Sequence, residues 1–483
     1  MTAIVTRVFL WQTEALRPGD TLLTATIRVI GVLAIALALC VQAIAAPDWK
    51  PIEANVRDAR LQGAWEDAST GHVVVFSDGR IDVFHRLDAF WIRDTGVVPA
   101  FALYAFDADT LLLQHYDYRA HPELLQAPKV LRRATPVPAA VMAQTAAGTL
   151  PPGEVFDLIW RTFDRYYAFF NERGVDWAAA RRTFDPRAQA AANDDALFDV
   201  LSEMLKPLQD GHVNLSHGER RFNAGRSQLR ERLKQAWARS GSALTEQAFV
   251  SDWHKRVSTS VYEVLDEGSL RSGAAGALEW GTIGDAGYVR VNRFAGFSET
   301  EATAPRPVQD EALRQALRAM DADLARTTRI IVDVALNGGG SDTAAMTVAS
   351  HFADAPRLVL EYGATGAPRQ RVALGPAGAP WRRPILLLTS EVTASAAESF
   401  VLMMRAYPHV TQVGERTRGI LSSLLPKPFP NGFMATIAYQ HVLDADGKAF
   451  EARGIPPARA IELFPDDDLT GGFARAVREL ARE

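Results

Sequence analysis

Cysteine is nearly absent from this chain of 483 residues, because Cys40 is the only one. One thiol cannot form an intrachain disulfide, and it cannot supply a thiolate metal site. The histidines of the N-terminal third also have a spacing that suits no metal ion: His72, His85, His115 and His121. We therefore expect no metal. We also expect no nucleotide cofactor, since the glycine loop at 338–340 lacks G-x-G-x-x-G spacing.

An excess of positive charge is missing as well. The formal net charge is −5, and no arginine-rich stripe or aromatic stacking platform interrupts the mildly acidic composition. Proteins that bind nucleic acid concentrate lysine and arginine on one surface, so we expect no nucleic-acid partner. The apolar content of 48% and charged content of 23% are those of ordinary globular domains, and the length predicts two or three of them.

An uncharged apolar run occupies residues 29–46, after Arg28. A basic flank, an apolar segment and the small-x-small pattern Ala43-Ile44-Ala45 are typical of a secretory signal peptide cleaved after Ala45. The run also approaches the length that spans a membrane, which leaves an uncleaved anchor as the second interpretation. Both interpretations predict an exported, periplasmic or extracytoplasmic protein, with membrane contact only through this segment.

The remaining sequence changes its pattern several times, and each change suggests a boundary. Alternating β-formers give way to an Ala/Pro/Thr-rich stretch, then to helical periodicity, and then to strand–helix alternation. We predict an α/β protein, α+β overall, with these parts: a signal or anchor (1–45), a β-rich domain (46–132), a linker (133–152), a helical subdomain (153–216), a helical insertion (217–280), an α/β core (281–465) and a C-terminal helix (466–483).

Within the α/β core, buried strands alternate with amphipathic helices. This order implies parallel pairing of the strands through crossover helices. One strand ends in the glycines at 338–340, which are followed by a helix. Such a loop presents backbone N–H groups to an anion or oxyanion, or is a plain flexible turn.

A second strand-to-helix turn lies at residues 384–405, PILLLTSEVTASAAESFVLMMR. It places Ser395 at the first turn of a helix, where free N–H groups and the helix dipole stabilise negative charge. Small neighbours would allow a substrate carbonyl to approach the hydroxyl. Serine is also a common helix cap, so this stretch alone leaves both interpretations open.

His212 lies where a predicted helix breaks at Asp210-Gly211 and passes into a strand. Loop positions of this kind keep an imidazole accessible while the scaffold holds it in place. Taken alone, however, His212 is better explained by a structural role.

The order of the motifs is more specific than any one of them. From Gly153 to about residue 465 the sequence resembles peptidase family S41, the tail-specific or C-terminal processing proteases, through this series: Leu208-Gln-Asp-Gly-His-Val213, Gly287-Tyr-Val-Arg-Val291, Asp333-x-x-x-Asn337-x-Gly339-Gly340, Thr393-Ala-Ser-Ala-Ala-Glu398, Gly414-Glu-x-Thr-x-Gly419, Pro430-Asn-Gly432 and Glu451-x-x-Gly454-Ile-x-Pro457.

The resemblance implies an S41-type fold with a parallel-rich mixed sheet and a serine endopeptidase that cleaves proteins or peptides. Its nucleophile would be Ser395. The oxyanion would be bound by the N–H groups of Ala396 and of Gly339 or Gly340. No cofactor is implied, and the oligomeric state is not predicted.

Two departures from the family pattern bear on the mechanism. The lysine base of the bacterial processing branch is missing, because the chain reads Gly419-Ile420-Leu421 at that place, and Lys427 lies beyond it between prolines. The residues from 216 to 286 also do not resemble the PDZ module of that branch.

The tricorn-like branch uses a histidine base, a serine and a glutamate instead. It is similar to this chain at His212, Ser395 and Glu451. An imidazole and a carboxylate suffice to activate a serine, although Glu451 could equally bind Ser395 or a backbone amide. Three further polar residues are expected to hold the loops of the site rather than react: Asp210, Asn337 and Glu398.

Two other functions remain compatible with these residues. One is an S41-fold protein that binds peptides or another ligand without cleaving them, which the missing lysine favours. The other is a serine hydrolase that acts on esters or amides other than peptides. Retention of His212, Ser395 and Glu451 favours the peptidase.

Overall fold

The structure is a computed structural model that describes residues 50–51, 57–87, 90–94, 102–106, 109–114, 124–125, 129–142, 148–298 and 306–483. The predicted signal or anchor, Cys40, His115 and His121 lie outside the described residues. In the described ranges, no helix has both the length and the apolar character needed to cross a membrane.

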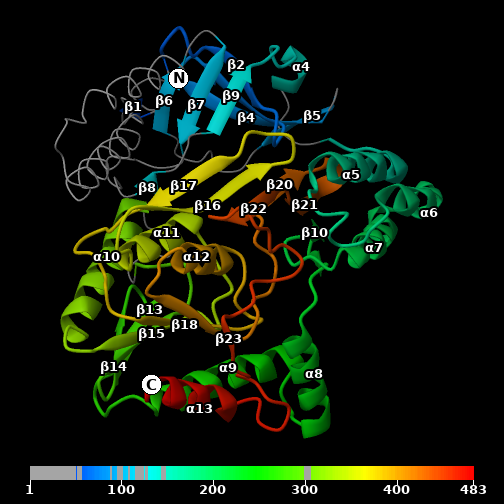
Figure 1. Cartoon of the computed structure of the whole chain (residues 1–483). Coiled ribbons are helices and arrows are strands. Elements are labelled where there is room, and N and C mark those ends of the chain that lie inside the picture. Colours follow the sequence, from blue (N-terminus) through cyan, green and yellow to red (C-terminus); the bar gives the residue numbers. More distant parts are fainter. Residues whose placement is uncertain are drawn as a thin grey trace, which may run out of the picture. The chain divides into compact units, whose positions relative to one another are not determined.

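The N-terminal region is an antiparallel sheet whose strands succeed one another in the order β6, β7, β9, β2, β3, β4 and β5 (Figure 1). Buried side chains alternate between its two faces, with Trp65 and Phe76 in one apolar cluster and Val73 and Phe84 in another. A short helix, α4 (Ala139–Met142), follows the sheet. The bounds of the strands are β1 Lys50–Pro51, β2 Gly63–Asp67, β3 His72–Ser77, β4 Arg80–Leu87, β5 Phe90–Asp94, β6 Ala102–Phe106, β7 Thr110–Gln114, β8 Leu124–Leu125 and β9 Lys129–Arg133.

Three helices and a small antiparallel sheet form the next unit, which carries the His212 loop. The sheet has the strand order β11-β10-β21-β20. Aromatic and aliphatic residues of the helices, among them Phe156, Phe163 and Leu201, share one core with Leu215, Phe433 and Ile437 of the sheet. The elements are α5 (Pro152–Tyr166), α6 (Trp177–Gln189), α7 (Asp194–Leu205), η1 (Lys206–Leu208), β10 (Asn214–His217), β11 (Arg220–Asn223), β20 (Leu424–Pro428), η2 (Pro430–Gly432) and β21 (Phe433–Ala438).

The central sheet has seven strands in the order β12-β13-β14-β15-β18-β19-β23. The pairs β14·β15, β15·β18, β18·β19 and β19·β23 are parallel, whereas β12 and β13 are antiparallel. Because parallel strands all end at the same edge, the loops after β15 and β18 are neighbours. The strands are β12 (Arg271–Gly273), β13 (Leu278–Ile283), β14 (Ala286–Val291), β15 (Arg329–Asp333), β18 (Ile385–Thr389), β19 (Val410–Gly414) and β23 (Arg459–Ala460).

Helices cover both faces of this sheet (Figure 1). On one face Leu313, Met346 and Phe400 pack against Val289, Val332 and Leu387. On the other, Trp253 and Phe473 pack against Tyr288 and Leu388. The first layer contains α10 (Arg306–Asp323), α11 (Asp342–His351) and α12 (Ala396–Arg405), and the second contains α8 (Gln228–Ser240), α9 (Glu246–Tyr262) and α13 (Gly471–Leu480).

A fourth sheet has the strand order β22-β16-β17-β8. Its strands are β16 (Arg357–Ala364), β17 (Gln370–Leu374), β22 (Gln440–Asp444) and β8, which pairs Leu125 with Ala373. A parallel-rich mixed sheet enclosed by helices confirms the predicted α/β fold class.

Candidate active site

Ser395 lies on a strained turn between β18 and α12. Its backbone angles are φ 58° and ψ −127°, on the positive-φ side that residues other than glycine rarely adopt. Its side chain is half-buried, and its N–H donates to Glu398 Oε2 at 3.3 Å. A serine on a sharp strand-to-helix turn is displayed at the edge of the sheet, where a hydroxyl can react.

The glycine loop after β15 lies directly against this turn. A Cβ atom on Gly339 would come within 2.7 Å of Ser395 Cβ and 2.8 Å of Ala394 O, so no larger residue fits there. Asn337, which is fully buried, joins the two loops: its Oδ1 accepts from Gly339 N (2.8 Å) and its carbonyl accepts from Ala394 N (3.1 Å). Asn337 therefore lies in the hydrogen-bonded support of the glycine loop.

Two N–H groups beside Ser395 remain available. Among the described residues, no hydrogen bond uses the N–H of Gly340 or of Ala396, whereas that of Gly339 is bound by Asn337. Gly340 is exposed, and Ala396 is the first residue of α12, where the helix dipole favours an anion. This pair can bind a developing oxyanion.

His212 is buried in the loop between η1 and β10. Its backbone N–H donates to Asp210 Oδ1 at 2.8 Å, and its backbone carbonyl accepts from Thr436 Oγ1 at 2.7 Å. Burial lowers the pKa of the imidazole and favours its neutral form, although the nearby Asp210 carboxylate opposes this shift. In the described part of the chain Nδ1 has no hydrogen-bond partner, and no hydrogen bond joins the ring to Ser395.

The loop at 417–422 is held from one side by Glu398, the fully buried third residue of α12. Glu398 Oε1 accepts from Thr417 Oγ1 (2.6 Å) and Gly419 N (2.7 Å), and Oε2 accepts from Ile420 N (2.9 Å) in addition to Ser395 N. Burial raises the pKa of this carboxyl, and its hydrogen bonds counteract that effect. Glu398 thus connects the serine turn to the loop.

Glu451 holds the same loop from the other side. Its Oε2 accepts from Leu421 N (2.8 Å) and Ser422 N (3.0 Å), and its Oε1 accepts from Arg173 Nη2 (2.9 Å). The structure thus places Glu451 on backbone amides, one of the arrangements that the sequence left open. Burial and the nearby Asp210 carboxylate raise the pKa of Glu451.

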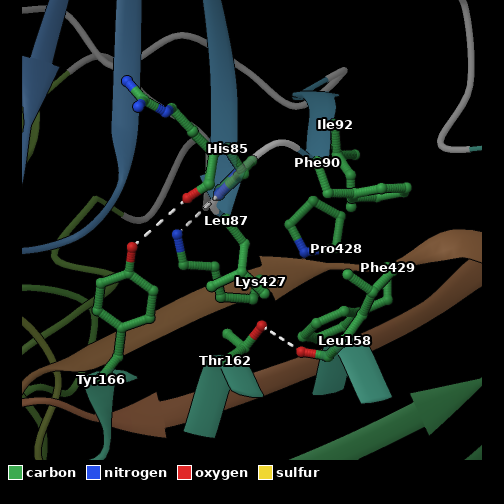
Figure 2. A pocket seen from close by; sticks show the side chains of 11 residues that line it. His85, Leu87, Phe90, Ile92, Leu158, Thr162, Tyr166, Lys427, Pro428 and Phe429 are labelled. Atoms are coloured by element: carbon green, nitrogen blue, oxygen red, sulfur yellow. Dashed lines mark hydrogen bonds between the residues drawn. The ribbon is translucent and has the colours of Figure 1, made fainter. Parts of the chain in front are cut away.

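Lys427 contacts a different part of the molecule (Figure 2). Its Nζ donates to Thr70 O and lies 3.4 Å from His85 Nδ1 and 4.9 Å from the centre of the Tyr166 ring. Beside it is a cavity of about 20 Å³, too small for an organic ligand. All these partners lie in the N-terminal region or on α5, so the contacts of Lys427 are those of a packed core residue.

Comparisons with known proteins agree with this architecture. Residues 285–461 match peptidase family S41, and residues 152–206 match the C1 domain of tricorn protease. A candidate peptidase from Parabacteroides merdae has a similar structure with a TM-score of 0.52, at 24% identity over 68% of this chain and 97% of its own. Mature CPAF gives 0.50, at 11% identity over 69% of this chain and 96% of its own. Likeness at such identities shows the fold alone.

The match to peptidase family S41 gives the class, a serine-type peptidase and therefore a hydrolase. Residues 285–461 carry the match to peptidase family S41, which the order of the motifs predicts.

Proposed function

We propose that the protein cleaves proteins or peptides through an acyl-enzyme on Ser395, with His212 as general base. The observation that carries the proposal is the strained Ser395 turn, which lies against Gly339 and beside the amides of Gly340 and Ala396, to which the described residues offer no acceptor. A hydroxyl next to two free donors is the arrangement that acyl transfer requires.

In the proposed reaction, Ser395 Oγ attacks the scissile carbonyl while the neutral His212 ring accepts the hydroxyl proton. The N–H groups of Gly340 and Ala396 bind the carbonyl oxygen as it becomes negative, with the loop of Gly339 held in place by Asn337. The imidazolium then gives its proton to the leaving amine, and water, deprotonated by the same ring, releases the acyl group. Burial, which lowers the pKa of His212, keeps the base neutral near pH 7.

His212 must approach Ser395 for this reaction. Hydrogen bonds between catalytic groups are often long without substrate and shorten when it binds. Glu451 acts in this scheme through the loop at 417–422, since its hydrogen bonds go to Leu421 N and Ser422 N. The division of roles among serine, histidine and glutamate follows the tricorn-like branch of the family.

One observation favours a second candidate, a peptide-binding protein that does not turn over its ligand. In the described residues Nδ1 of His212 has no hydrogen-bond partner, so no carboxylate accepts from that nitrogen as it would in a catalytic triad. We also propose that the protein acts outside the cytoplasm, because residues 29–46 have the composition of an export signal.

Labelling with a fluorophosphonate, followed by mass spectrometry of the modified peptide, tests the proposal. We expect the parent to be labelled at Ser395, Ser395→Ala to be unlabelled, and His212→Ala to react at least about 100-fold more slowly. A folded parent that does not react would support the binding protein instead. Hydrolysis of an ester but not of a fluorescent casein would indicate a hydrolase that does not act on peptides.

A further inference from the structure

Arg173 lies between the histidine loop and the loop at 417–422. It follows α5 and immediately precedes Gly174, whose φ of 66° turns the chain toward α6. The side chain is only 9% exposed. An arginine buried to this degree needs several acceptors, and the structure supplies them from three separate segments of the chain.

The guanidinium contacts each of these segments. Nη1 donates to Gln209 O (2.8 Å), on the segment that leads into the Asp-Gly-His motif. Nη2 donates to Gly419 O (3.3 Å) and to Glu451 Oε1 (2.9 Å), and lies 3.5 Å from Asp210 Oδ2. The same Asp210 oxygen accepts from Tyr167 OH at 2.9 Å.

We propose that Arg173 is a positioning residue of the catalytic centre, which fixes the His212 loop against the loop that Glu398 and Glu451 hold behind Ser395. The inference rests on the proposed function and extends it to a residue that does not touch substrate. Asp210 links Arg173 to the histidine loop, because its Oδ1 accepts from the backbone N–H of His212 while its Oδ2 faces the guanidinium.

The geometry requires arginine rather than any cation. A guanidinium has five donors in a rigid fork, so one group can bind two carbonyls and two carboxylates at fixed angles. A lysine would keep the charge but has a single nitrogen on a flexible stem. Arg173→Lys therefore separates the charge of the residue from its shape.

The charge also acts on the imidazole. After burial, Asp210 and a backbone hydrogen bond of Ser422, the positive charge of Arg173 is the next cause that shifts the pKa of His212, and it lowers that pKa, as does Arg418. Removal of the charge should raise that pKa, so that His212 stays protonated to a higher pH. The labelling rate falls at low pH, where His212 becomes protonated. The pH at which it falls, the acid limb of the pH profile, should therefore move upward in Arg173→Gln and stay in place in Arg173→Lys.

The experiment measures fluorophosphonate labelling of the full chain as a function of reagent concentration and pH. In Arg173→Gln we expect the limiting rate to fall about 10- to 100-fold with little change in the half-saturating concentration, because a small displacement of catalytic groups has effects of that size. Arg173→Lys should recover part of the rate. Arg187→Gln is the control, since Arg187 lies on the same subdomain but pairs with Glu203 at the surface.

Thermal unfolding of each variant separates positioning from folding. If Arg173→Gln does not fold, Arg173→Lys and Tyr167→Phe decide, since Tyr167→Phe removes only the hydroxyl that supports Asp210. Parent-like labelling in a folded Arg173→Lys and a folded Tyr167→Phe would overturn the inference, as would a folded Arg173→Gln whose acid limb does not move. An unreactive parent would instead overturn the proposed function.

Discussion

Two regions of the molecule bury ionisable side chains, and they differ in how many hydrogen bonds each buried group makes. Around the site, Asp210, Glu398 and Glu451 each accept hydrogen bonds from several donors, and Arg173 lies between two of them. Lys427 is just as buried, at 3% exposed, but its amine contacts one carbonyl, one imidazole and a ring face. Burial shifts the pKa of Glu398, Glu451 and Lys427 alike toward the neutral form, but hydrogen bonds counteract that shift only at the two carboxylates.

The neutral tendency is visible in the surroundings of Lys427. Burial, the largest cause, and the neighbouring Arg165 lower the pKa of its amine while Asp67 and Asp94 raise it, and the net pKa is about 7. Burial also lowers the pKa of His85, whose Nε2 lies 3.1 Å from Asp94 Oδ2. The apolar lining of the adjacent cavity, which includes Phe90, Leu158 and Phe429, explains why burial dominates (Figure 2).

Removal of a satisfied carboxylate gives the largest expected effect. Glu398→Ala leaves four buried donors without their acceptor, those of Ser395, Thr417, Gly419 and Ile420. We expect the free energy of unfolding to fall by about 3–5 kcal/mol, with loss of labelling at Ser395. Urea denaturation measures the change, with the exposed Glu462→Ala as control. Equal stability of Glu398→Ala and the parent would mean that the carboxylate is not the support we describe.

A substitution in the glycine loop has a smaller expected effect, and it tests the site without altering any charge. Gly339→Ala introduces a Cβ at 2.7 Å from Ser395 Cβ, at a φ of 109° that alanine rarely adopts. We expect labelling to slow by about 100-fold or more, because the displaced loop moves the proposed oxyanion donor. Gly338→Ala is the matched control, since nothing lies within 4 Å of its added Cβ. Equal rates in the two variants would contradict the close approach of the loops.

The smallest expected effect concerns Lys427 and pH. The pKa of a lysine is about 10.5 in the unfolded chain and about 7 in the fold. Between these values the unfolded chain binds the extra proton, so stability rises with pH and is lost as pH falls from 10.5 toward 7.

Lys427→Met removes this group, and urea unfolding between pH 7 and 9 should show a slope lower by about 1.4 kcal/mol per pH unit than that of the parent. Labelling of Ser395 should stay within several-fold of the parent rate. An unchanged slope would show that the amine keeps its proton, and a large loss of labelling would return Lys427 to the mechanism.

The local parts of this structure could be predicted from sequence, and the links between them could not. The apolar run before Ser395 and the helical period after it indicate a strand and a helix, and the structure has β18 and α12 there. The approach of Gly339 to that turn follows from parallel pairing of β15 with β18. Backbone amides, by contrast, leave no side-chain pattern, so the partners of Glu398 and Glu451 could not be identified.

Arg173 was missed for a related reason. It lies 278 positions from Glu451 and stands in an aromatic helical stretch whose periodicity indicates only packing. An arginine beside the glycine that ends a helical segment resembles an ordinary solvated residue. Only the folded chain shows that three distant segments share its guanidinium.

The packing of Ile420 has an evolutionary consequence. This residue occupies the place where the processing branch of the family is expected to carry its lysine, and its Cδ1 lies 3.0 Å from the position of a Cβ on Gly211. The side chain therefore fills the space beside the residue that precedes His212. Because Ile420 already fills this space, a longer side chain at position 420 would press on the segment that bears His212. Under the proposed mechanism, a lysine base at position 420 would therefore require coordinated changes on both loops.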